Sequence, residues 1–374
     1  MNKNIIYLNN AATSWPKPPC VVEAVSRALS EPPGAMHRGG IESFDVFDEV
    51  RKKLAALMGL KNHSRIALGP NASWGLNVGI QGFGLKEGDC ALTSIAEHNS
   101  VLRPLYALRE RRGVKLCFAE CDESGRIIPE SWESLTRKFR PSLSVMTHAS
   151  NVTGAVSDTK TLAEISHSFG SAVLLDASQS LGFLDVKPEE LGADMLAFTG
   201  HKYLLGPQGT GGLWIGSGLE LSPLLLGGTG IMSELESMPD KMPLRLEAGT
   251  GNEPSFFGLL AALNWAEKNP VDIRAVSSLL GYMTEGLSEL GCRVMAPFGE
   301  KTPVLSFNVP GISPEDAGFM LEESCDIILR QGLHCAPLIF KALGEKQSLR
   351  ASLSRFTKKS DVDALLKAVS DIRA

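Results

Sequence analysis

AVLLDASQSLGFLDVKPEELGADMLAFTGHK, residues 172–202, decides the fold class of this chain. It contains two short strand-like runs, 172–176 and 194–198, and a polar residue ends or follows each of them. Apolar runs of this length are typical of strands that are buried on both faces, as in a parallel sheet. Ligands bind such sheets at the carboxyl ends of the strands, so the residues after each run are the first candidates for a functional site.

The same pattern extends from about residue 43 to residue 216, where strand-like runs alternate with amphipathic, helix-length stretches. The other expected strands are 65–68, 90–93, 114–118, 143–147 and 212–215. The expected helices between them include 43–58, 100–112 and 159–169. This alternation predicts an α/β fold with a mostly parallel, seven-stranded sheet.

A second, smaller α/β region follows the sheet. Residues 216–251 are rich in Gly, Pro, Ser and Met and predict a long excursion. Beyond it we expect helices at 254–268, 314–323 and 360–373 and strands at 302–309 and 327–329. We therefore expect a large domain at 15–255 and a small domain made of 1–14 and 256–374.

Composition excludes several classes of protein. The chain has 374 residues, a formal net charge of -5 and 43% hydrophobic residues, which is ordinary for a globular protein. Near-neutral charge disfavours a nucleic-acid or membrane-surface role, and no apolar stretch is long enough to span a membrane. Seven cysteines without a signal peptide or paired metal-ligand spacing predict a reducing, cytoplasmic location and no metal site.

Asp176 and Lys202 carry the chemistry of the opening stretch. A carboxylate at the end of the most apolar strand is costly unless a cation or strong donor meets it. Lys202 stands one strand–crossover–strand step later, so the two groups are expected on neighbouring strands. A lysine beside an acid is what pyridoxal phosphate needs: the amine bonds the cofactor aldehyde and the acid keeps the ring nitrogen protonated.

Several further motifs, in this order, make the chain resemble the class V aminotransferase family of pyridoxal phosphate fold type I. Within that family it is similar to the cysteine desulfurase and selenocysteine lyase branch. The resemblance covers nearly the whole chain. The motifs are 8–13 (LNNAAT), 37–39 (HRG), 97–99 (EHN), 150–154 (SNVTG), 176–179 (DASQ), 199–202 (TGHK), 247–252 (EAGTGN), 330–337 (RQGLHCAP) and 349–352 (LRAS).

The resemblance implies the cofactor contacts. Lys202 would hold pyridoxal phosphate, Asp176 would pair with its ring nitrogen, and His98 would stack on the ring as a catalytic residue. Ring-oxygen contacts are implied for Gln179 and Asn151. Phosphate contacts are implied for Ser73, Thr199, His201 and, from the neighbouring subunit of a homodimer, Thr250.

The resemblance also implies the substrate contacts. Arg350 would clamp the substrate carboxylate, because a guanidinium pairs with a carboxylate in two places. Asn151, His37 and Arg38 would add further substrate contacts. Cys335, in a loop bounded by Gly332 and Pro337, would attack the sulfur of L-cysteine and leave L-alanine and a persulfide.

Two features of the sequence bear on these roles. Either His334 or Arg330 could place a positive charge beside the Cys335 sulfur. At the phosphate turn the chain reads Asn71-Ala72-Ser73-Trp74, so Trp74 replaces an acid and one hydroxyl of the family pattern is missing.

The sequence thus predicts a homodimeric, cytoplasmic cysteine desulfurase that passes sulfur to an acceptor protein. One alternative is a selenocysteine lyase or another carbon–sulfur lyase with the same cofactor. A different class of alternative is a non-catalytic scaffold of this fold that binds a sulfur-carrier protein. Neither nucleic acid nor a membrane is expected as a partner.

Overall fold

The computed structural model describes residues 5–32 and 44–373. Its main feature is a seven-stranded sheet with the strand order β2-β8-β7-β6-β5-β3-β4. The strands are β2 (Ile66–Gly69), β3 (Cys90–Ser94), β4 (Lys115–Ala119), β5 (Leu143–Thr147), β6 (Ala172–Asp176), β7 (Met195–Thr199) and β8 (Gly211–Ile215). Strand β8 is antiparallel to both of its neighbours, β2 and β7, and the other pairs in this sheet are parallel. The predicted fold class is confirmed.

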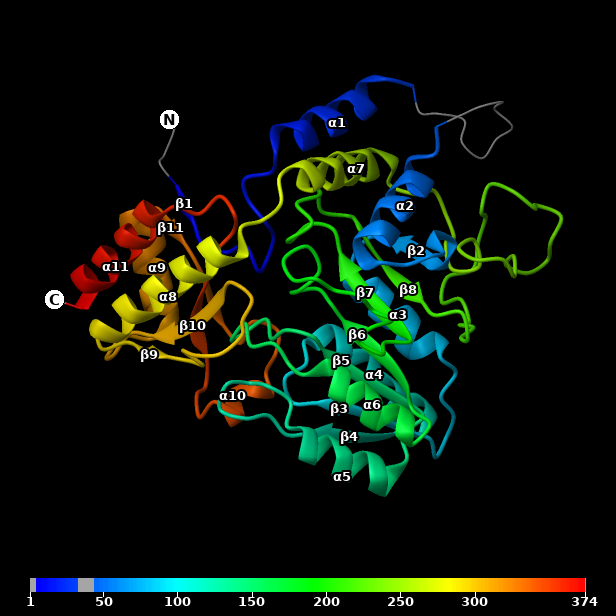
Figure 1. Cartoon of the computed structure of the whole chain (residues 1–374), viewed down its shortest axis with the longest axis horizontal. Helices are drawn as coiled ribbons and strands as arrows, with labels where there is room; N and C mark the ends of the chain where they lie inside the picture. Colours follow the sequence, from blue (N-terminus) through cyan, green and yellow to red (C-terminus); the bar gives the residue numbers. More distant parts are fainter. Residues whose placement is uncertain (1–4, 33–43, 374) are drawn as a thin grey trace.

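Both faces of this sheet are buried, as the unbroken apolar runs predicted. Along β7, Met195 and Ala197 contribute to one core, whereas Leu196 and Phe198 contribute to the other. This alternation follows from the two-residue period of a strand. Helices cover the two faces, so the sheet is the middle of three layers (Figure 1).

The helices of the large region include those expected at 43–58, 100–112, 159–169 and 254–268. They are α1 (Pro19–Ser30), α2 (Val46–Met58), α3 (Ala72–Gly82), α4 (Asn99–Arg112), α5 (Pro129–Phe139), α6 (Thr159–Ser168) and α7 (Glu253–Lys268), with a 3-10 turn η1 (His63–Arg65) before β2. Helices α3 and α4 pack in one core, and α2, α5, α6 and α7 in the other. The amino ends of α3 and α4 therefore lie beside the carboxyl ends of the parallel strands.

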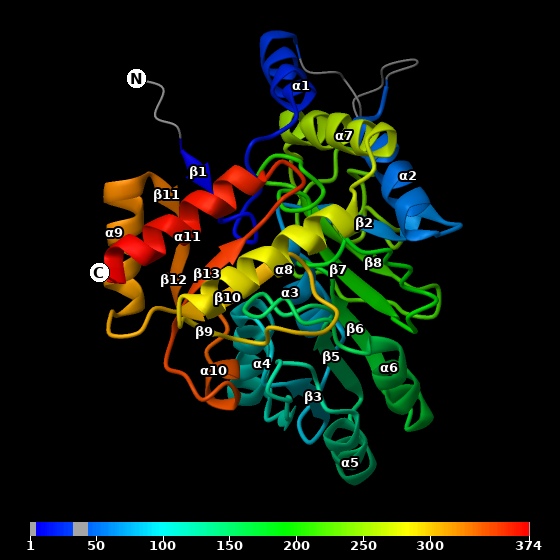
Figure 2. The same cartoon turned by 60° about the vertical axis from the view of Figure 1, so that its left-hand side comes forward.

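The C-terminal region forms a second core with its own antiparallel sheet. This sheet has the order β12-β13-β10-β9, and β1 pairs with β11 beside it. Helices α8, α9 and α11 lie together on this lobe (Figure 2). The bounds are β1 (Ile6–Tyr7), α8 (Ile273–Glu289), β9 (Arg293–Val294), β10 (Val304–Asn308), α9 (Pro314–Cys325), β11 (Ile327–Ile328), β12 (Arg330–Gly332), α10 (Ile339–Ala342), β13 (Ser348–Ser352) and α11 (Lys359–Arg373).

The packing of α7 bears on where the two domains divide. Phe256, Leu259 and Leu263 of α7 belong to the core of the large sheet, although the sequence prediction begins the small domain at residue 256. The apolar residues of α8, by contrast, belong to the core of the small lobe. We therefore propose a boundary between α7 and α8 rather than at residue 255.

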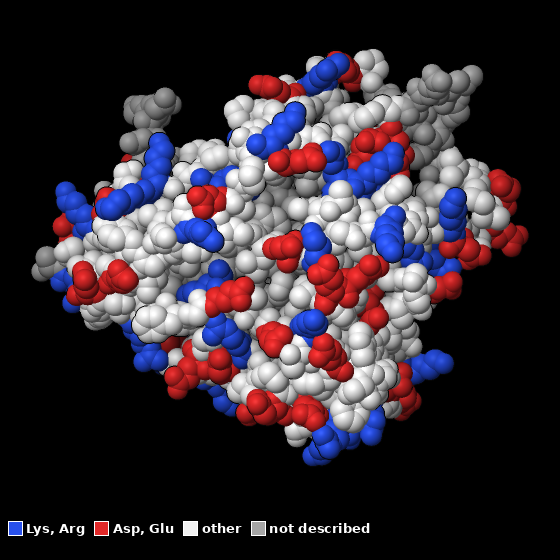
Figure 3. All heavy atoms as spheres, viewed as in Figure 1, with Lys and Arg blue, Asp and Glu red and all other residues white. Residues whose placement is uncertain are grey.

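The segment 217–251 contains no helix or strand and crosses the surface beside the large sheet. In the described ranges, no helix is both long and apolar enough to cross a membrane. Acidic and basic side chains are interspersed on the face drawn in Figure 3. This mixture agrees with the near-neutral net charge and offers no broad basic patch on that face.

Close packing of α3 against the sheet depends on glycine. A Cβ atom on Gly75 would lie 2.6 Å from the carbonyl oxygen of Gly212 in β8. Gly281, in the exposed part of α8, would meet nothing within 4 Å. The two helical glycines therefore form a matched pair, one in tight contact and one in open space.

Gly75→Ala is expected to lower the free energy of unfolding by about 1–3 kcal/mol, because the added methyl overpacks a backbone contact. Gly281→Ala should raise it by about 0.5–1 kcal/mol, because alanine has the better helix propensity. Urea denaturation of both variants measures these changes. Equal stability of Gly75→Ala and wild type would contradict the close approach of α3 to β8.

Candidate active site

The candidate site lies at the carboxyl edge of the large sheet, where β7 ends and a tight turn begins. In that turn Gly200 N–H donates to the Thr210 carbonyl (2.9 Å) and Leu205 N–H donates to the Lys202 carbonyl (2.9 Å). The Thr199 side chain is buried and its Oγ1 lies 3.5 Å from the Thr210 carbonyl. The backbone of the turn is thus closed, and it places Lys202 at the edge of the sheet.

Lys202 has a strongly perturbed amine. Burial, helped by the positive charges of Arg350 and Arg330, lowers its pKa to about 8, although the charge of Asp176 opposes the shift. Among the described residues the amine forms no hydrogen bond or ion pair, although part of the side chain stays accessible. A deep amine without a fixed partner is free to react with a ligand.

Asp176 is fixed at the end of β6. It is buried, and its Oδ1 accepts a hydrogen bond from the Ser178 N–H at 2.9 Å. Its charge acts on Lys202, as the order β7-β6 in the sheet requires. The predicted proximity of acid and amine is therefore present in the structure.

Gln179 and His98 lie around the same edge. The Gln179 amide donates to the Ala11 carbonyl (3.1 Å), but its buried Oε1 has no hydrogen-bond partner. His98 caps α4, because its Nδ1 accepts from the Ser100 N–H at 3.0 Å. Burial and then the charge of Lys202 lower the pKa of His98 to about 3, so its ring is neutral. A neutral ring can lie against another ring without adding charge to this site.

Two helix amino ends meet beside His98. Ser73, in the first turn of α3, and Ser100, in the first turn of α4, lie with their hydroxyls 2.6 Å apart. The N–H groups of Asn99 and Ser100 at the start of α4 are already paired, whereas no described partner takes those of Ala72 and Ser73 at the start of α3. These N–H groups and the helix dipole favour an anion at the amino end of α3. Ser100 was not among the residues expected here, although its place three residues after Glu97 at a helix start could have indicated it. The Trp74 ring packs against Gly69.

Arg350 lies on β13 of the small lobe and is fully buried. It donates to the Asn151 carbonyl (2.8 Å) and to Asn9 Oδ1 (3.3 Å), but its Nε has no partner. Burial lowers its pKa to about 9. Within the described ranges no carboxylate pairs with it, so a buried positive charge is left for an anionic ligand.

Cys335 lies in a strained loop beside β13. His334 and Cys335 have φ angles of +49° and +59°, in the left-handed region. The loop is nevertheless fixed at both residues: Asn151 Nδ2 donates to the His334 carbonyl (2.7 Å), and Asn99 N–H donates to the Cys335 carbonyl (2.7 Å). The backbone of Cys335 is thereby tied to the amino end of α4, next to His98.

Arg330, and not His334, is the residue beside the Cys335 sulfur. The Arg330 guanidinium donates to Cys335 Sγ at 3.1 Å. The His334 ring is buried, directed to the Ser348 hydroxyl (2.9 Å), and its lowered pKa keeps it neutral. Of the two expected alternatives, the structure supports the guanidinium.

Four of the predicted site residues are left: Thr250, His37, Arg38 and His201. Thr250 is exposed just before α7. His37 and Arg38 lie outside the described residues. The His201 ring has an unpartnered, buried Nδ1, and burial lowers its pKa to about 4. Thr250, His37 and Arg38 therefore stay predictions.

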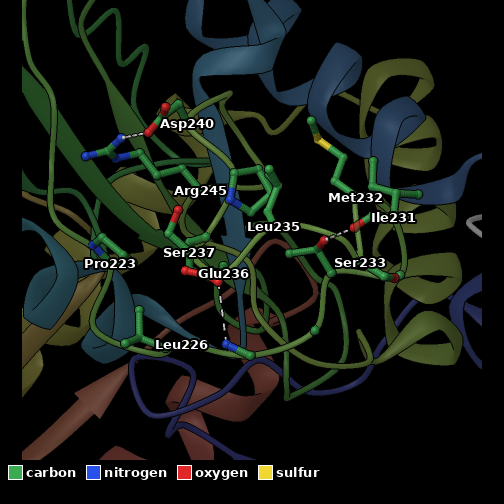
Figure 4. A pocket seen from close by; sticks show the side chains of 16 residues that line it. Pro223, Leu226, Ile231, Met232, Ser233, Leu235, Glu236, Ser237, Asp240 and Arg245 are labelled. Atoms are coloured by element: carbon green, nitrogen blue, oxygen red, sulfur yellow. Dashed lines mark hydrogen bonds and ion pairs between the residues drawn. The ribbon is translucent and has the colours of Figure 1, made fainter.

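A separate hollow lies in the segment between β8 and α7 (Figure 4). The residues that line it lie between Pro223 and Arg245, and none of these lining residues is a lysine, cysteine or histidine. In the described part of the chain, no group of three or more His, Cys, Asp or Glu side chains could hold a metal ion. The site around Lys202, and not this hollow, therefore has the amine, thiol and imidazole side chains that catalysis would use.

Comparison with known proteins identifies the class to which this site belongs. The model of the family "Aminotransferase class-V" matches residues 6–365. The chain belongs to the class V aminotransferase family, as its motifs indicated.

Three similar proteins from that class are described as cysteine desulfurases. A "probable cysteine desulfurase" of Pyrococcus abyssi is 32% identical over 100% of this chain and 95% of its own length. A "probable cysteine desulfurase" of Methanothermobacter thermautotrophicus is 31% identical over 98% of this chain and 94% of its own length. The solved apo structure of the cysteine desulfurase from Thermococcus onnurineus superposes with a TM-score of 0.87 at 31% identity and covers 98% of this chain and 94% of that one.

The uncompensated charge of Arg350 predicts stabilisation by a small carboxylate. Propionate at about 100 times its dissociation constant should raise the free energy of unfolding by about 2.7 kcal/mol. Arg350→Met should abolish this gain, whereas Arg274→Met, at an exposed position of α8, should keep it. Thermal unfolding with and without propionate measures the difference, and an unchanged gain in Arg350→Met would contradict the assignment.

Proposed function

We propose that this chain is a pyridoxal-phosphate-dependent cysteine desulfurase that converts L-cysteine to L-alanine and keeps the sulfur on Cys335 as a persulfide. The curated relatives support the activity by their names. The observation that carries the proposal is the meeting of three groups from two lobes: the Lys202 amine, the uncompensated Arg350 guanidinium and the Cys335 thiol.

The residues present fit pyridoxal phosphate. The unpartnered Lys202 amine suits the aldehyde, and the buried Gln179 Oε1 without a partner suits a donor on the ring. Asp176 suits a protonated ring nitrogen, and the Ser73–Ser100 junction suits the phosphate. When bound, the cofactor supplies an electron sink that allows bonds at the substrate Cα and Cβ to break.

Residues of the chain bind the substrate, transfer its proton and position the reacting groups. Arg350 binds the substrate carboxylate and thereby orients the amino acid. The Lys202 amine, with its pKa near 8, takes the proton from the substrate Cα and returns it at carbon. Asn151 contacts both the Arg350 guanidinium and the Cys335 loop, so it keeps the two at a fixed separation.

Sulfur transfer balances without an external oxidant. The Cys335 sulfur attacks the substrate sulfur, a sulfur–sulfur bond forms, and the substrate carbon–sulfur bond breaks. The electron pair of the broken bond stays with carbon, and a proton is added there to give the alanine methyl group. The enzyme is left with a persulfide on Cys335, and Arg330 lies beside that sulfur.

The two alternatives are less well supported. A non-catalytic scaffold would not need to bury Lys202 and Arg350 without a paired carboxylate, which costs stability. A selenocysteine lyase would use the same residues, but the two curated relatives compared above are described as probable cysteine desulfurases. Comparing alanine release from cysteine, selenocysteine and cystine discriminates among the lyases.

The partners and the location are part of the proposal. Exposed Thr250 and exposed leucines such as Leu225 and Leu226 support a second copy of the chain as a partner. An acceptor protein would take the persulfide sulfur from Cys335. All seven cysteines are free thiols, which supports a reducing, cytoplasmic compartment.

The pKa of Lys202 predicts how the apoprotein takes up its cofactor. Only the neutral amine attacks an aldehyde, so the loading rate should rise about tenfold per pH unit below pH 8 and level off above it. An ordinary lysine would keep the rate rising to beyond pH 10. Stopped-flow absorbance of apoprotein mixed with pyridoxal phosphate measures the profile, with Lys202→Ala as the variant that should form no bound chromophore.

Cys335 should be the only site that gains one sulfur atom when the holoenzyme meets L-cysteine. Mass spectrometry of peptides should find the adduct on Cys335, together with released alanine, and Cys335→Ala should lose both. Cys325→Ala, which removes a cysteine remote from Lys202 in the sequence and on α9, should behave as wild type. A protein that neither binds the cofactor nor releases alanine would contradict the proposed function.

A further inference from the structure

The carbonyl oxygen of His201 is the most heavily hydrogen-bonded group near the site. Four donors from one N-terminal segment converge on it. They are Ser14 N–H (3.0 Å), Thr13 Oγ1 (3.2 Å), Ser14 Oγ (3.1 Å) and Lys17 Nζ (2.8 Å). This oxygen belongs to the peptide group that joins His201 to Lys202, so the contacts act on the backbone of the reactive lysine.

Lys202 depends on such backbone contacts for its position. In the described part of the chain its amine forms no hydrogen bond or ion pair, so no side-chain contact of that kind fixes its direction. The turn hydrogen bond to the Lys202 carbonyl holds the following peptide group. The preceding peptide group is held by the segment 13–17, and the two together fix the Cα–Cβ direction.

Lys17 provides the shortest and only charged contact of the four. Its Nζ donates both to the His201 carbonyl and to the Ser14 hydroxyl (2.7 Å). Hydrogen bonds from a charged donor are shorter and stronger than neutral ones. Burial lowers the pKa of Lys17 to about 8, and among the described residues no carboxylate pairs with it. Keeping this contact therefore costs the protein part of the hydration free energy of the Lys17 ammonium group.

We propose that Lys17 is a positioning residue for Lys202: its ammonium group holds the His201 carbonyl and, through that peptide bond, sets where the Lys202 amine lies. This inference rests on the proposed function, because the position matters for cofactor loading and for proton transfer. It assigns Lys17 no contact with the substrate, whose carboxylate is left to Arg350.

The segment also connects Lys202 to the small lobe. Asn10 donates to the Ser352 carbonyl (3.0 Å) in β13, and Ala11 N–H donates to the Ser352 hydroxyl (2.8 Å). Asn10 Oδ1 accepts from Trp15 N–H (3.1 Å), which ties the two halves of the segment together. Through this segment, Lys17 keeps Lys202 at a fixed position relative to β13, the strand that carries Arg350.

The experiment compares Lys17→Met, Lys17→Gln and Lys17→Arg with Lys61→Met, which removes an exposed lysine. Two quantities are measured: the rate of covalent cofactor loading by the apoprotein, and kcat and KM for alanine release. A misplaced amine should slow loading and kcat in Lys17→Met by roughly ten- to a hundredfold. KM should stay within about threefold, because Arg350 is unchanged. Lys17→Arg should recover most of both rates, and Lys61→Met should equal wild type.

The controls separate the two proposals from each other and from misfolding. Thermal unfolding of each apoprotein reports its stability, and Lys17→Gln provides a second neutral variant if Lys17→Met does not fold. Loading and kcat equal to wild type in a folded neutral variant would overturn the role of Lys17, as would a loss confined to KM. Wild-type protein that loads the cofactor but releases no alanine from L-cysteine would overturn the proposed function, while the loading rates would still test Lys17.

Discussion

Excess positive charge in a buried site is the constraint on which this molecule depends. At the junction of the two lobes, the charges of Arg330 and Arg350 lower the pKa of Lys202, Arg330 also lowers that of Arg350, and Asp176 is the acid that opposes the shift at Lys202. Such a site is costly to fold because each cation loses water without gaining a full counter-charge. An anionic cofactor and an amino-acid carboxylate relieve that cost, because these ligands supply the negative charge that the site lacks.

The two lobes supply different parts of this site. The carboxyl edge of the large sheet provides Asp176 and Lys202, and the amino ends of α3 and α4 lie beside it. The small lobe provides Arg330, Cys335 and Arg350 through β12, β13 and the loop between them. Asn151 and the segment 9–17 are the contacts that hold the two sets together.

Much of the large sheet was predictable from sequence, because its strands are apolar runs of ordinary length. Each predicted strand lies within a residue or two of the observed one, from β2 to β8. The placement of α7 was less predictable. Its sequence indicates a helix but does not say which core its apolar face joins, and the structure packs Phe256 and Leu259 against the large sheet.

The sequence by itself determined the chemistry available: an amine and an acid at the ends of neighbouring strands, a guanidinium in a strand, and a cysteine in a constrained loop. Local pattern suffices for these, because strand period and chain order decide which residues reach the edge of a parallel sheet. Only the tertiary structure decided that Arg330 rather than His334 faces the thiol, that Ser100 joins Ser73, and that Lys17 reaches the His201 carbonyl. Those contacts depend on side-chain direction in a loop with left-handed backbone and on partners up to 184 positions apart, which no local pattern encodes.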